Sequence, residues 1–266
     1  MLQAKSVAVV VAHPDDEVIG IGGHLDLLPS VRLVHVTDGA PRDLVDARRN
    51  AFNTRDVYAE ARRRELECAM ALANIPPDRL ECFGFVDQET SLHLATIARQ
   101  LAGWLADHRI ELVLTHPYEG GHPDHDATAF AVHSACRLLL PQCDGTEIRI
   151  IEMTSYHAGP DGELVTDTFL PSSFATGSDD EIYLPLSDDQ RVLKRRMLYC
   201  HTSQAEVLAA FSVEAERLRP APNYNFTEPP HPGKLWYERF TWGMRGERWR
   251  VLAAQALDQL GLSTCR

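Results

Sequence analysis

The sequence predicts an α/β protein with a mostly parallel, Rossmann-like sheet and helices on both of its faces. Two observations predict this class. Four short apolar runs, at 7–12, 31–36, 80–83 and 111–115, alternate with stretches of helical periodicity, which is the pattern of βα units. Polar motifs also follow two of these runs, and α/β sheets bind ligands where the carboxyl ends of their strands meet.

The elements follow one another in a regular order. The runs at 7–12 and 31–36 predict two buried strands. Residues 40–55 then show little periodicity and predict a long loop, a type of segment that often lines active sites. The arginines around this loop favour a solvated face with ion pairs over a rim that recognises anions. They are Arg42, Arg48, Arg49, Arg55 and residues 62–64.

Three helices are predicted from spacing and capping signals. After residue 92 and again after residue 126, apolar side chains recur at steps of three and four, which gives each helix one face to pack on a sheet. The first set is Leu94, Ile97, Leu101, Trp104 and Leu105, and the second is Ala127, Phe130, Ala131, Ala135 and Leu138. Ser187 and Gln190 form a capping-box pattern, so another helix is expected from there through Cys200.

The C-terminal part is rich in proline and aromatic residues. Five prolines and seven aromatic residues lie between residues 220 and 249. So many aromatic rings are costly to leave in water, and residues 220–250 are therefore expected to form an ordered arm packed on the rest of a single domain spanning 1–266. A sugar-stacking wall and a dimer contact are the alternatives for this arm.

Composition excludes several classes of protein. The net charge of −12 argues against a nucleic-acid partner, which needs a basic footprint. Apolar runs are shorter than the roughly 20 residues of a membrane helix, and no basic signal region precedes the first strand, so a cytoplasmic protein without membrane association is expected. The six cysteines lack CxxC pairs, and reduced, mostly buried thiols are expected rather than a disulfide framework. The oligomeric state stays open, a homo-oligomer included.

Two motifs supply the ligands of a catalytic metal site. His13-Pro14-Asp15-Asp16-Glu17 follows the first strand, and Gly121-His122-Pro123-Asp124-His125 follows the run at 111–115. A catalytic zinc ion takes three protein ligands from His and carboxylate groups and leaves one position for water. His13, Asp16 and His125 can supply that set, because parallel strands bring both motifs to the same edge of the sheet.

The neighbouring side chains suit proton transfer. Asp15 stands beside the ligands and is predicted to accept the proton of the attacking water. His122, in its protonated form, is predicted to donate to an oxyanion or to the leaving nitrogen, with Asp124 orienting it. Glu17 either hydrogen-bonds a ligand or caps the turn, and both roles stay open. His116 is expected to line the pocket.

These motifs resemble those of the PIG-L/LmbE family of zinc-dependent N-deacetylases, which have a Rossmann-like scaffold. The resemblance implies that His13, Asp16 and His125 bind zinc, that Asp15 is the general base and that His122 is its electrostatic or acid partner. Softer matches imply that Arg62, followed by Glu65 in an R-x-x-E pattern, and Asp87 face the substrate. His201-Thr202-Ser203-Gln204 resembles the H-x-x-Q segment of the family, without an assigned role. Some members carry a tyrosine two residues before the first histidine of the second motif; this chain has Gly120 there, and Tyr118 is the expected replacement.

The expected function is therefore hydrolysis of an amide by a metal-activated water. The expected substrate is a small N-acyl amino sugar or glycoside, most simply an N-acetyl one, and Zn²⁺ is the implied cofactor, although His and Asp ligands serve several divalent ions. One alternative is cleavage of a thiol-sugar conjugate at the same site. A second is a nucleotide-binding module, prompted by Gly20-Ile21-Gly22-Gly23, and a third is a metal-binding protein without catalysis.

Overall fold

The computed structural model describes residues 4, 6–28, 30–140, 147–170 and 181–263, and these are built around a seven-stranded sheet. The strand order is β3-β2-β1-β4-β5-β9-β8, in which the first five strands are parallel and the last two are antiparallel to their neighbours. The strands are β1 (Val7–Val11), β2 (Arg32–Pro41), β3 (Leu80–Asp87), β4 (Leu112–Thr115), β5 (Arg149–Met153), β8 (Ile182–Pro185) and β9 (Ala215–Pro220). A separate antiparallel pair consists of β6 (Tyr156–Ala158) and β7 (Leu164–Thr166).

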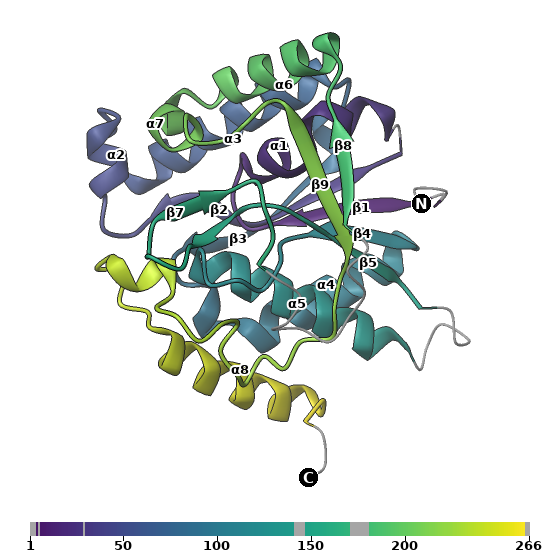
Figure 1. Cartoon of the computed structure of the whole chain (residues 1–266), viewed down its shortest axis with the longest axis vertical. Helices are drawn as coiled ribbons and strands as arrows, with labels where there is room; N and C mark the ends of the chain where they lie inside the picture. Colours follow the sequence, from purple (N-terminus) through teal and green to yellow (C-terminus); the bar gives the residue numbers. More distant parts are fainter. Residues whose placement is uncertain (1–3, 5, 29, 141–146, 171–180, 264–266) are drawn as a thin grey trace.

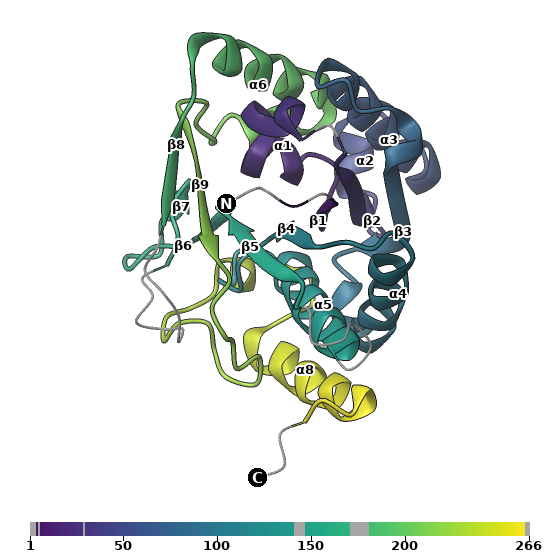
Figure 2. The ribbon, with the colours of Figure 1, turned by 90° about the vertical axis from the view of Figure 1, so that its right-hand side faces the viewer.

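Helices cover both faces of the sheet, which confirms the predicted fold class (Figures 1 and 2). One face carries α1 (Asp16–Ile21), α3 (Arg55–Leu72) and α6 (Asp188–Cys200), and the other carries α4 (Leu94–Asp107), α5 (Pro123–Leu139) and α8 (Gly246–Leu260). The shorter helices are α2 (Val45–Arg49) and α7 (Ala205–Leu208). The 3₁₀ helices are η1 (Gly22–Leu27), η2 (Pro77–Arg79), η3 (Thr90–Leu92), η6 (Thr202–Gln204) and η7 (Trp236–Arg239).

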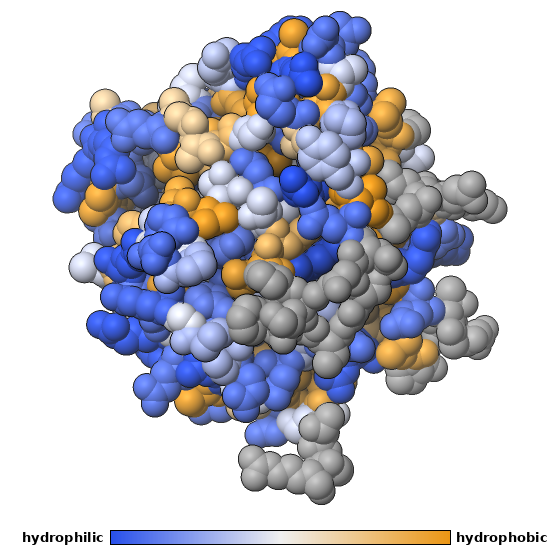
Figure 3. Space-filling view, viewed as in Figure 1, coloured by the Kyte–Doolittle hydropathy of each residue, from blue (hydrophilic) through white to orange (hydrophobic). Residues whose placement is uncertain are grey.

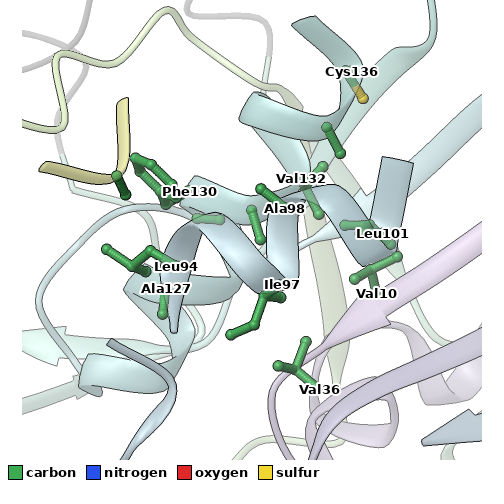
Figure 4. Close-up of a cluster of buried hydrophobic side chains, with 14 of the residues drawn as sticks. Val10, Val36, Leu94, Ile97, Ala98, Leu101, Ala127, Phe130, Val132 and Cys136 are labelled. Atoms are coloured by element: carbon green, nitrogen blue, oxygen red, sulfur yellow. The ribbon is translucent and has the colours of Figure 1, made fainter. Parts of the chain in front are cut away.

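The alternation of side chains along β1 divides the core into two layers. Val9 belongs to the cluster beneath α1, α3 and α6, whereas Val10 belongs to the cluster beneath α4, α5 and α8. Figure 4 shows Val10 turned toward Leu101 and Ile97, two of the residues whose spacing predicts α4. Each such side chain contributes roughly 1.5–3 kcal/mol on full burial, so the two layers hold β1, and the motif that follows it, in place.

The capping box predicted at Ser187 is present. The Gln190 backbone N–H donates to Ser187 Oγ at 3.3 Å, and the Ser187 N–H donates to Gln190 Oε1 at 3.0 Å. These two bonds satisfy donors that a helix start otherwise leaves free, which explains why α6 begins there.

The long loop predicted at 40–55 is wrong in part. β2 continues to Pro41, α2 occupies Val45–Arg49, and α3 begins at Arg55 with Thr54 as its cap. A five-residue helix is too short to show helical periodicity, so the sequence pattern misses it. The prediction of a solvated face with ion pairs is confirmed for Arg42, whose Nε lies 2.8 Å from Glu89 Oε1, and Arg55 pairs with Asp38. It is wrong for Arg62, which is buried.

Aromatic residues of the C-terminal segment enter the core. Phe226, Tyr237 and Trp249 are buried in the cluster that contains α4 and α5, and Trp249 Nε1 donates to the Pro123 carbonyl at 3.2 Å. Trp249 belongs to α8, so the irregular part of the segment ends earlier than residue 250. Within the described residues, no helix is long and apolar enough to cross a membrane.

The predicted burial of the cysteines is wrong for two of them. Cys136 is buried, but Cys68 and Cys82 are exposed and Cys200 is partly exposed. Cys68 lies on the outer side of α3, where helical position rather than residue type decides its exposure. Cys143 and Cys265 lie outside the described residues.

Candidate functional site

The two sequence motifs meet at the carboxyl edge of the sheet. β1 and β4 are adjacent parallel strands, with Val10 paired to Thr115, so the segments that follow them emerge side by side. A pocket of about 140 Å³ opens at this edge. Its wall includes His13, Asp15, Asp16, His122 and His125, together with Arg62 and Asp87. The structure thus gathers seven of the nine predicted site residues around one cavity.

The three predicted ligands have the spacing of a metal site. His13 Nδ1 lies 3.2 Å from Asp16 Oδ2, His125 Nε2 lies 3.2 Å from Asp16 Oδ1, and the two ring nitrogens are 3.3 Å apart. Metal–ligand bonds of 2.0–2.2 Å in a tetrahedron put neighbouring ligand atoms about 3.3–3.6 Å apart. The two histidines face different oxygens of Asp16, so these distances do not place one carboxylate oxygen beside both rings. Among the described residues, donor atoms within 4.8 Å of one another form three groups: His13, His122 and His125; His13, Asp87, His122 and Asp124; and Asp16, His116 and His125. The donors around the pocket could therefore hold a divalent ion.

Hydrogen bonds fix the orientation of each predicted ligand. The backbone N–H of His13 donates to Asp16 Oδ2 at 2.7 Å. His13 Nε2 lies 3.2 Å from Asp87 Oδ1, which leaves Nδ1 free for a metal, and His125 Nδ1 lies 3.3 Å from Ser155 Oγ, which leaves Nε2 free. Partners of this kind fix the tautomer of a ligating histidine.

Asp124 orients a different histidine from the one predicted. Its carboxylate accepts hydrogen bonds from the Gln88 and Thr90 backbone N–H groups and lies 3.4 Å from His13 Nε2. Its link to His122 runs through the backbone, because the Asp124 N–H donates to His122 Nδ1 at 3.1 Å. At the first turn of α5 the Asp124 side chain points back toward β3, so the sequence neighbour is not the spatial partner.

Asp15 is held in a strained backbone conformation next to a cation. Its φ of 141° lies in a region that non-glycine residues avoid at a cost of about 1–3 kcal/mol, and such strain concentrates at functional sites. Arg62 Nη2 donates to Asp15 Oδ2 at 3.1 Å and to the Pro14 carbonyl at 2.8 Å. Burial raises the pKa of Asp15 to about 8, and the charge of Arg62 opposes that rise.

Glu17 caps the turn rather than touching a ligand. Its Oε2 accepts the Asp15 backbone N–H at 3.1 Å and lies 3.0 Å from His35 Nε2. The carboxylate thus fixes the backbone that presents Asp15, and the buried His35, which no motif marked, supports it.

His122 presents an N–H group to the pocket. As the N-cap of α5, its Nδ1 accepts the Asp124 N–H, so the neutral ring carries its proton on Nε2. Burial and the nearby His13 lower the pKa of His122 to about 3, which favours this neutral form, so the prediction of a protonated ring is wrong. Its ring packs at 4.6 Å from the Trp242 ring.

Two predicted pocket residues lie elsewhere. The Tyr118 hydroxyl donates to the Glu228 carbonyl at 2.9 Å, and its ring stacks on Trp249 at 5.2 Å inside the core, so Tyr118 does not replace the missing tyrosine. His116 lies behind the ligands instead of lining the pocket. It stacks on His125 at 4.0 Å, and its Nε2 accepts the Ala12 N–H at 3.0 Å.

The glycine group after the first motif serves packing. A Cβ at Gly20 would lie 2.9 Å from Met153 Cβ, and one at Gly23 would lie 2.7 Å from Leu186 Cδ1. These glycines belong to α1 and η1 and let them approach the sheet, so they do not form a phosphate-binding loop.

Glu65 joins the R-x-x-E helix to the H-x-x-Q segment. Its carboxylate accepts hydrogen bonds from Thr202 Oγ1 at 2.7 Å and from the Ser203 N–H at 2.8 Å. Gln204, which follows, reaches the pocket wall, and its Nε2 donates to Tyr58 Oη at 2.7 Å. The two family-like patterns therefore act as one structural unit on the rim of the site.

Several pocket residues carried no usable sequence signal. Asp46 and Gln88 come from short segments after β2 and β3, Tyr156 begins β6, and Phe211 and Trp242 come from the C-terminal third. Each stands alone in its sequence neighbourhood, so only the fold brings them together. The aromatic richness around residue 242 was the one available hint.

Fold and site together define an α/β protein with a candidate metal site for hydrolysis at the carboxyl edge of its sheet. Residues 8–136 match the family model PIG-L, described as GlcNAc-PI de-N-acetylase. This stretch contains both motifs, and the predicted resemblance to the PIG-L/LmbE family is confirmed. A comparison with curated proteins gave no match.

Solved structures share the fold. The zinc-inhibited form of teicoplanin deacetylase Orf2 aligns with a TM-score of 0.59 and 14% identity, over 83% of this chain and all of the other. The A40926 pseudoaglycone deacetylase Dbv21 gives 0.59 and 18%, over 81% and 96%. N,N'-diacetylchitobiose deacetylase from Pyrococcus horikoshii gives 0.56 and 19%, over 82% and 85%. At these identities the comparison establishes the fold alone.

Proposed function

We propose that the protein is a zinc-dependent hydrolase that removes an N-acyl group, most simply acetyl, from an amino sugar or glycoside. One observation carries the proposal: His13 Nδ1 and His125 Nε2 lie 3.3 Å apart, each 3.2 Å from one oxygen of Asp16, beside the carboxylate of Asp15. The matching family, described as GlcNAc-PI de-N-acetylase, and the three structural relatives, all deacetylases, support the same chemistry.

His13, Asp16 and His125 would hold the metal ion. When bound, such an ion supplies Lewis-acid polarisation of the amide carbonyl and lowers the pKa of water. Zinc suits a site of two imidazoles and one carboxylate, and the imidazole orientations set by Asp87 and Ser155 already expose the required nitrogens.

Asp15 and His122 would manage charge and protons during the reaction. Asp15, as carboxylate, takes a proton from the attacking water, and the same proton then passes to the nitrogen as the C–N bond breaks. His122 donates its Nε2–H to the carbonyl oxygen as negative charge develops there. Water is consumed, and a carboxylic acid and a free amine are the products.

Arg62 would act on Asp15 rather than on the substrate directly. Its guanidinium keeps the Asp15 carboxylate oriented and favours its charged form. Asp87 and Asp124 would position His13 through its outer nitrogen. In this proposal Arg62 and Asp87 act through Asp15 and His13, and not by contact with the substrate as the resemblance implies.

The test measures metal content and amine release on the same preparation. Near-stoichiometric zinc, with release of free amine from methyl N-acetylglucosaminide that a chelator stops and zinc restores, is expected. Asp15→Asn should keep the metal and lose most turnover, while Asp107→Asn, an exposed carboxylate on α4, should change neither. Metal-free activity, or full turnover in Asp15→Asn, would overturn the proposal.

A further inference from the structure

The pocket at the metal site is smaller than the proposed substrate. Its volume of about 140 Å³ is close to that of an engineered cavity of about 150 Å³ that holds one benzene molecule. An acyl group and the adjoining part of a sugar ring fill such a space. The remainder of a glycoside must therefore lie outside it.

A second cavity continues from the first. It has a volume of about 480 Å³, and Tyr156, Phe211 and Trp242 line both. We call it the annex. Because the two cavities share these residues, the part of a bound substrate that does not fit in the pocket can extend into the annex.

The annex gathers exposed apolar side chains. Val45, Leu164, Val207 and Phe240 all line it, with exposed fractions of 52%, 39%, 54% and 42%. Hydrophobic side chains meet between α7 and β7 on the face shown in Figure 3. Apolar residues collected from four separate segments around one cavity are typical of a ligand-binding surface.

A row of aromatic rings leads from the catalytic site into the annex. The Trp242 ring lies 4.6 Å from the His122 ring and stacks on Phe240 at 4.3 Å with an interplanar angle of 13°. Phe240 in turn meets Trp236 at 6.1 Å. Flat rings presented in this way favour a planar aromatic group through stacking.

The charges of the annex disfavour an anionic group. The described lining contains three carboxylates, of Asp43, Asp46 and Glu206, and one cation, Arg49. Arg49 Nη1 lies 3.3 Å from Asp46 Oδ1. A phosphate-bearing group would meet three carboxylates and a guanidinium that is already paired. An uncharged group avoids that repulsion.

We propose that the substrate is an N-acyl amino sugar whose glycosidic substituent is an uncharged aromatic group, which occupies the annex. This inference rests on the proposed hydrolase function and adds the identity of the substituent. The metal site then acts on the acyl group while the aromatic row binds the other end of the molecule.

The experiment compares three N-acetylglucosamine derivatives: the methyl glycoside, the 4-nitrophenyl glycoside and the 1-phosphate. We expect kcat/KM for the aryl glycoside to exceed that for the methyl glycoside at least tenfold. Phe240→Ala should lower the ratio of the aryl kcat/KM to the methyl kcat/KM roughly threefold to tenfold, as expected for loss of one stacked ring. Tyr199→Ala, which removes an exposed aromatic ring on α6 outside the annex, is the control and should leave this ratio unchanged.

A binding measurement separates this inference from the function on which it rests. In chelator-treated protein, the aryl glycoside should quench tryptophan fluorescence at lower concentration than the methyl glycoside, and Phe240→Ala should remove the difference. Equal turnover and equal binding of the methyl and aryl glycosides, or a preference for the 1-phosphate, would overturn the annex assignment while the hydrolase function stands. Amine release from none of the three would count against the hydrolase function, and the binding comparison would still decide the annex.

A second inference rests on a different observation, the contact between Cys68 and Cys200. The two Sγ atoms lie 2.8 Å apart, although the residues are far apart in sequence, and both side chains are at least partly exposed. Cys68 lies on α3 and Cys200 ends α6, next to the 202–204 turn that Glu65 already holds. A disulfide bond of about 2.05 Å needs only a small approach of the two sulfurs.

We propose that Cys68 and Cys200 form a reversible disulfide by exchange with a small disulfide such as oxidised glutathione. The Cys68 thiolate attacks it and releases one glutathione thiol; the Cys200 thiolate then attacks the Cys68 sulfur and releases the second. Two protein thiols are oxidised, one small disulfide is reduced, and both protons end on glutathione. The bond would tie α3, which carries Arg62, to the turn that carries Gln204.

Peptide mapping after incubation in glutathione buffers tests this bond. A linked Cys68–Cys200 peptide that dithiothreitol releases, with a higher Tm for the oxidised protein, is expected. Cys82→Ser, which removes another exposed thiol, should keep the link, and Cys200→Ser should abolish it. Glutathione attached to Cys68 without the internal link, or unchanged thiol content, would contradict the proposal.

Discussion

Arg62 reaches across from α3 to hydrogen-bond Asp15, 47 residues earlier in the chain, with Nη2 3.1 Å from Oδ2. Both side chains are buried, and the guanidinium also binds the Pro14 and Gly39 carbonyls at 2.8 and 2.9 Å. The cation is therefore fixed by backbone groups on either side of the base. Its position decides how readily the Asp15 carboxylate stays charged.

Loss of Arg62 should move the pH dependence of turnover. Burial raises the pKa of Asp15 and Arg62 lowers it, so Arg62→Ala removes the opposing effect. Because Asp15 accepts a proton only as carboxylate, the acidic limb of kcat/KM against pH should shift to higher pH, by about one unit or more. Arg62→Lys keeps the charge and should shift the limb less.

The control for this shift is Arg63→Ala. Arg63 is on the same helix but pairs with Glu67 at 2.7 Å on the outer face. Arg63→Ala should therefore leave the acidic limb of kcat/KM against pH unchanged. An unmoved limb in Arg62→Ala would show that Asp15 is not the group that titrates.

His122 performs two functions that one substitution can separate. Asn at position 122 can still accept the Asp124 N–H and cap α5, but it lacks the Nε2–H that faces the pocket. His122→Asn should therefore lower kcat roughly 10²–10³-fold with an almost unchanged Tm. His122→Ala should lose the same activity and, in addition, about 1 kcal/mol of stability, measured by urea unfolding.

Comparable kcat values for His122→Asn and the unsubstituted protein would contradict the donor role. A similar Tm for His122→Ala would contradict the capping role. The two measurements test independent contacts of one ring.

The sequence predicts the place of the two motifs in the fold well, because strand periodicity and motif position reinforce each other. Val9 and Val10 mark a strand buried on both faces, so His13 must fall at its carboxyl edge, and the same reasoning applies to His125 after β4. Parallel pairing then brings the two together. No side-chain detail is needed for that inference.

Contacts set by tertiary packing are where prediction from sequence fails. Asp124 lies beside His122 in sequence yet faces His13, because the first turn of α5 aims its side chain at β3. Tyr118 is close to the second motif in sequence, but its ring packs in the core, where it stacks on Trp249 from the C-terminal helix α8. Such choices depend on neighbours that local periodicity does not describe.

Gly121 allows the loop before His122 to approach the strand β6. A Cβ at this position would lie 2.0 Å from the Tyr156 carbonyl oxygen, a backbone atom that cannot move aside. Gly121→Ala should therefore displace His122 and His125, reduce zinc content and lower stability by more than about 2 kcal/mol. Metal analysis and urea unfolding would measure both effects.

The matched control is Gly103→Ala in α4, where a Cβ meets nothing within 4 Å. Removing a glycine from an exposed helix position should raise stability by about 0.5–1 kcal/mol and leave zinc content unchanged. Equal behaviour of the two variants would show that the contact with Tyr156 does not constrain the loop.

Acid should destabilise the protein partly through His133, which lies far from the metal site. Burial and the neighbouring Arg137 lower the pKa of His133 to about 4, from about 6.5 in an unfolded chain. Between these pH values the unfolded state binds the proton and the folded state does not, so stability is full above about pH 6.5 and falls as the pH approaches 4. His133→Phe, whose ring can pack against Tyr224 and Phe226 as His133 does, removes this proton uptake. The free energy of unfolding, measured in urea, should decrease from pH 7 to pH 4.5 in both proteins, and the decrease should be about 1–3 kcal/mol smaller in His133→Phe. An equal decrease in both proteins would assign the acid sensitivity to other groups.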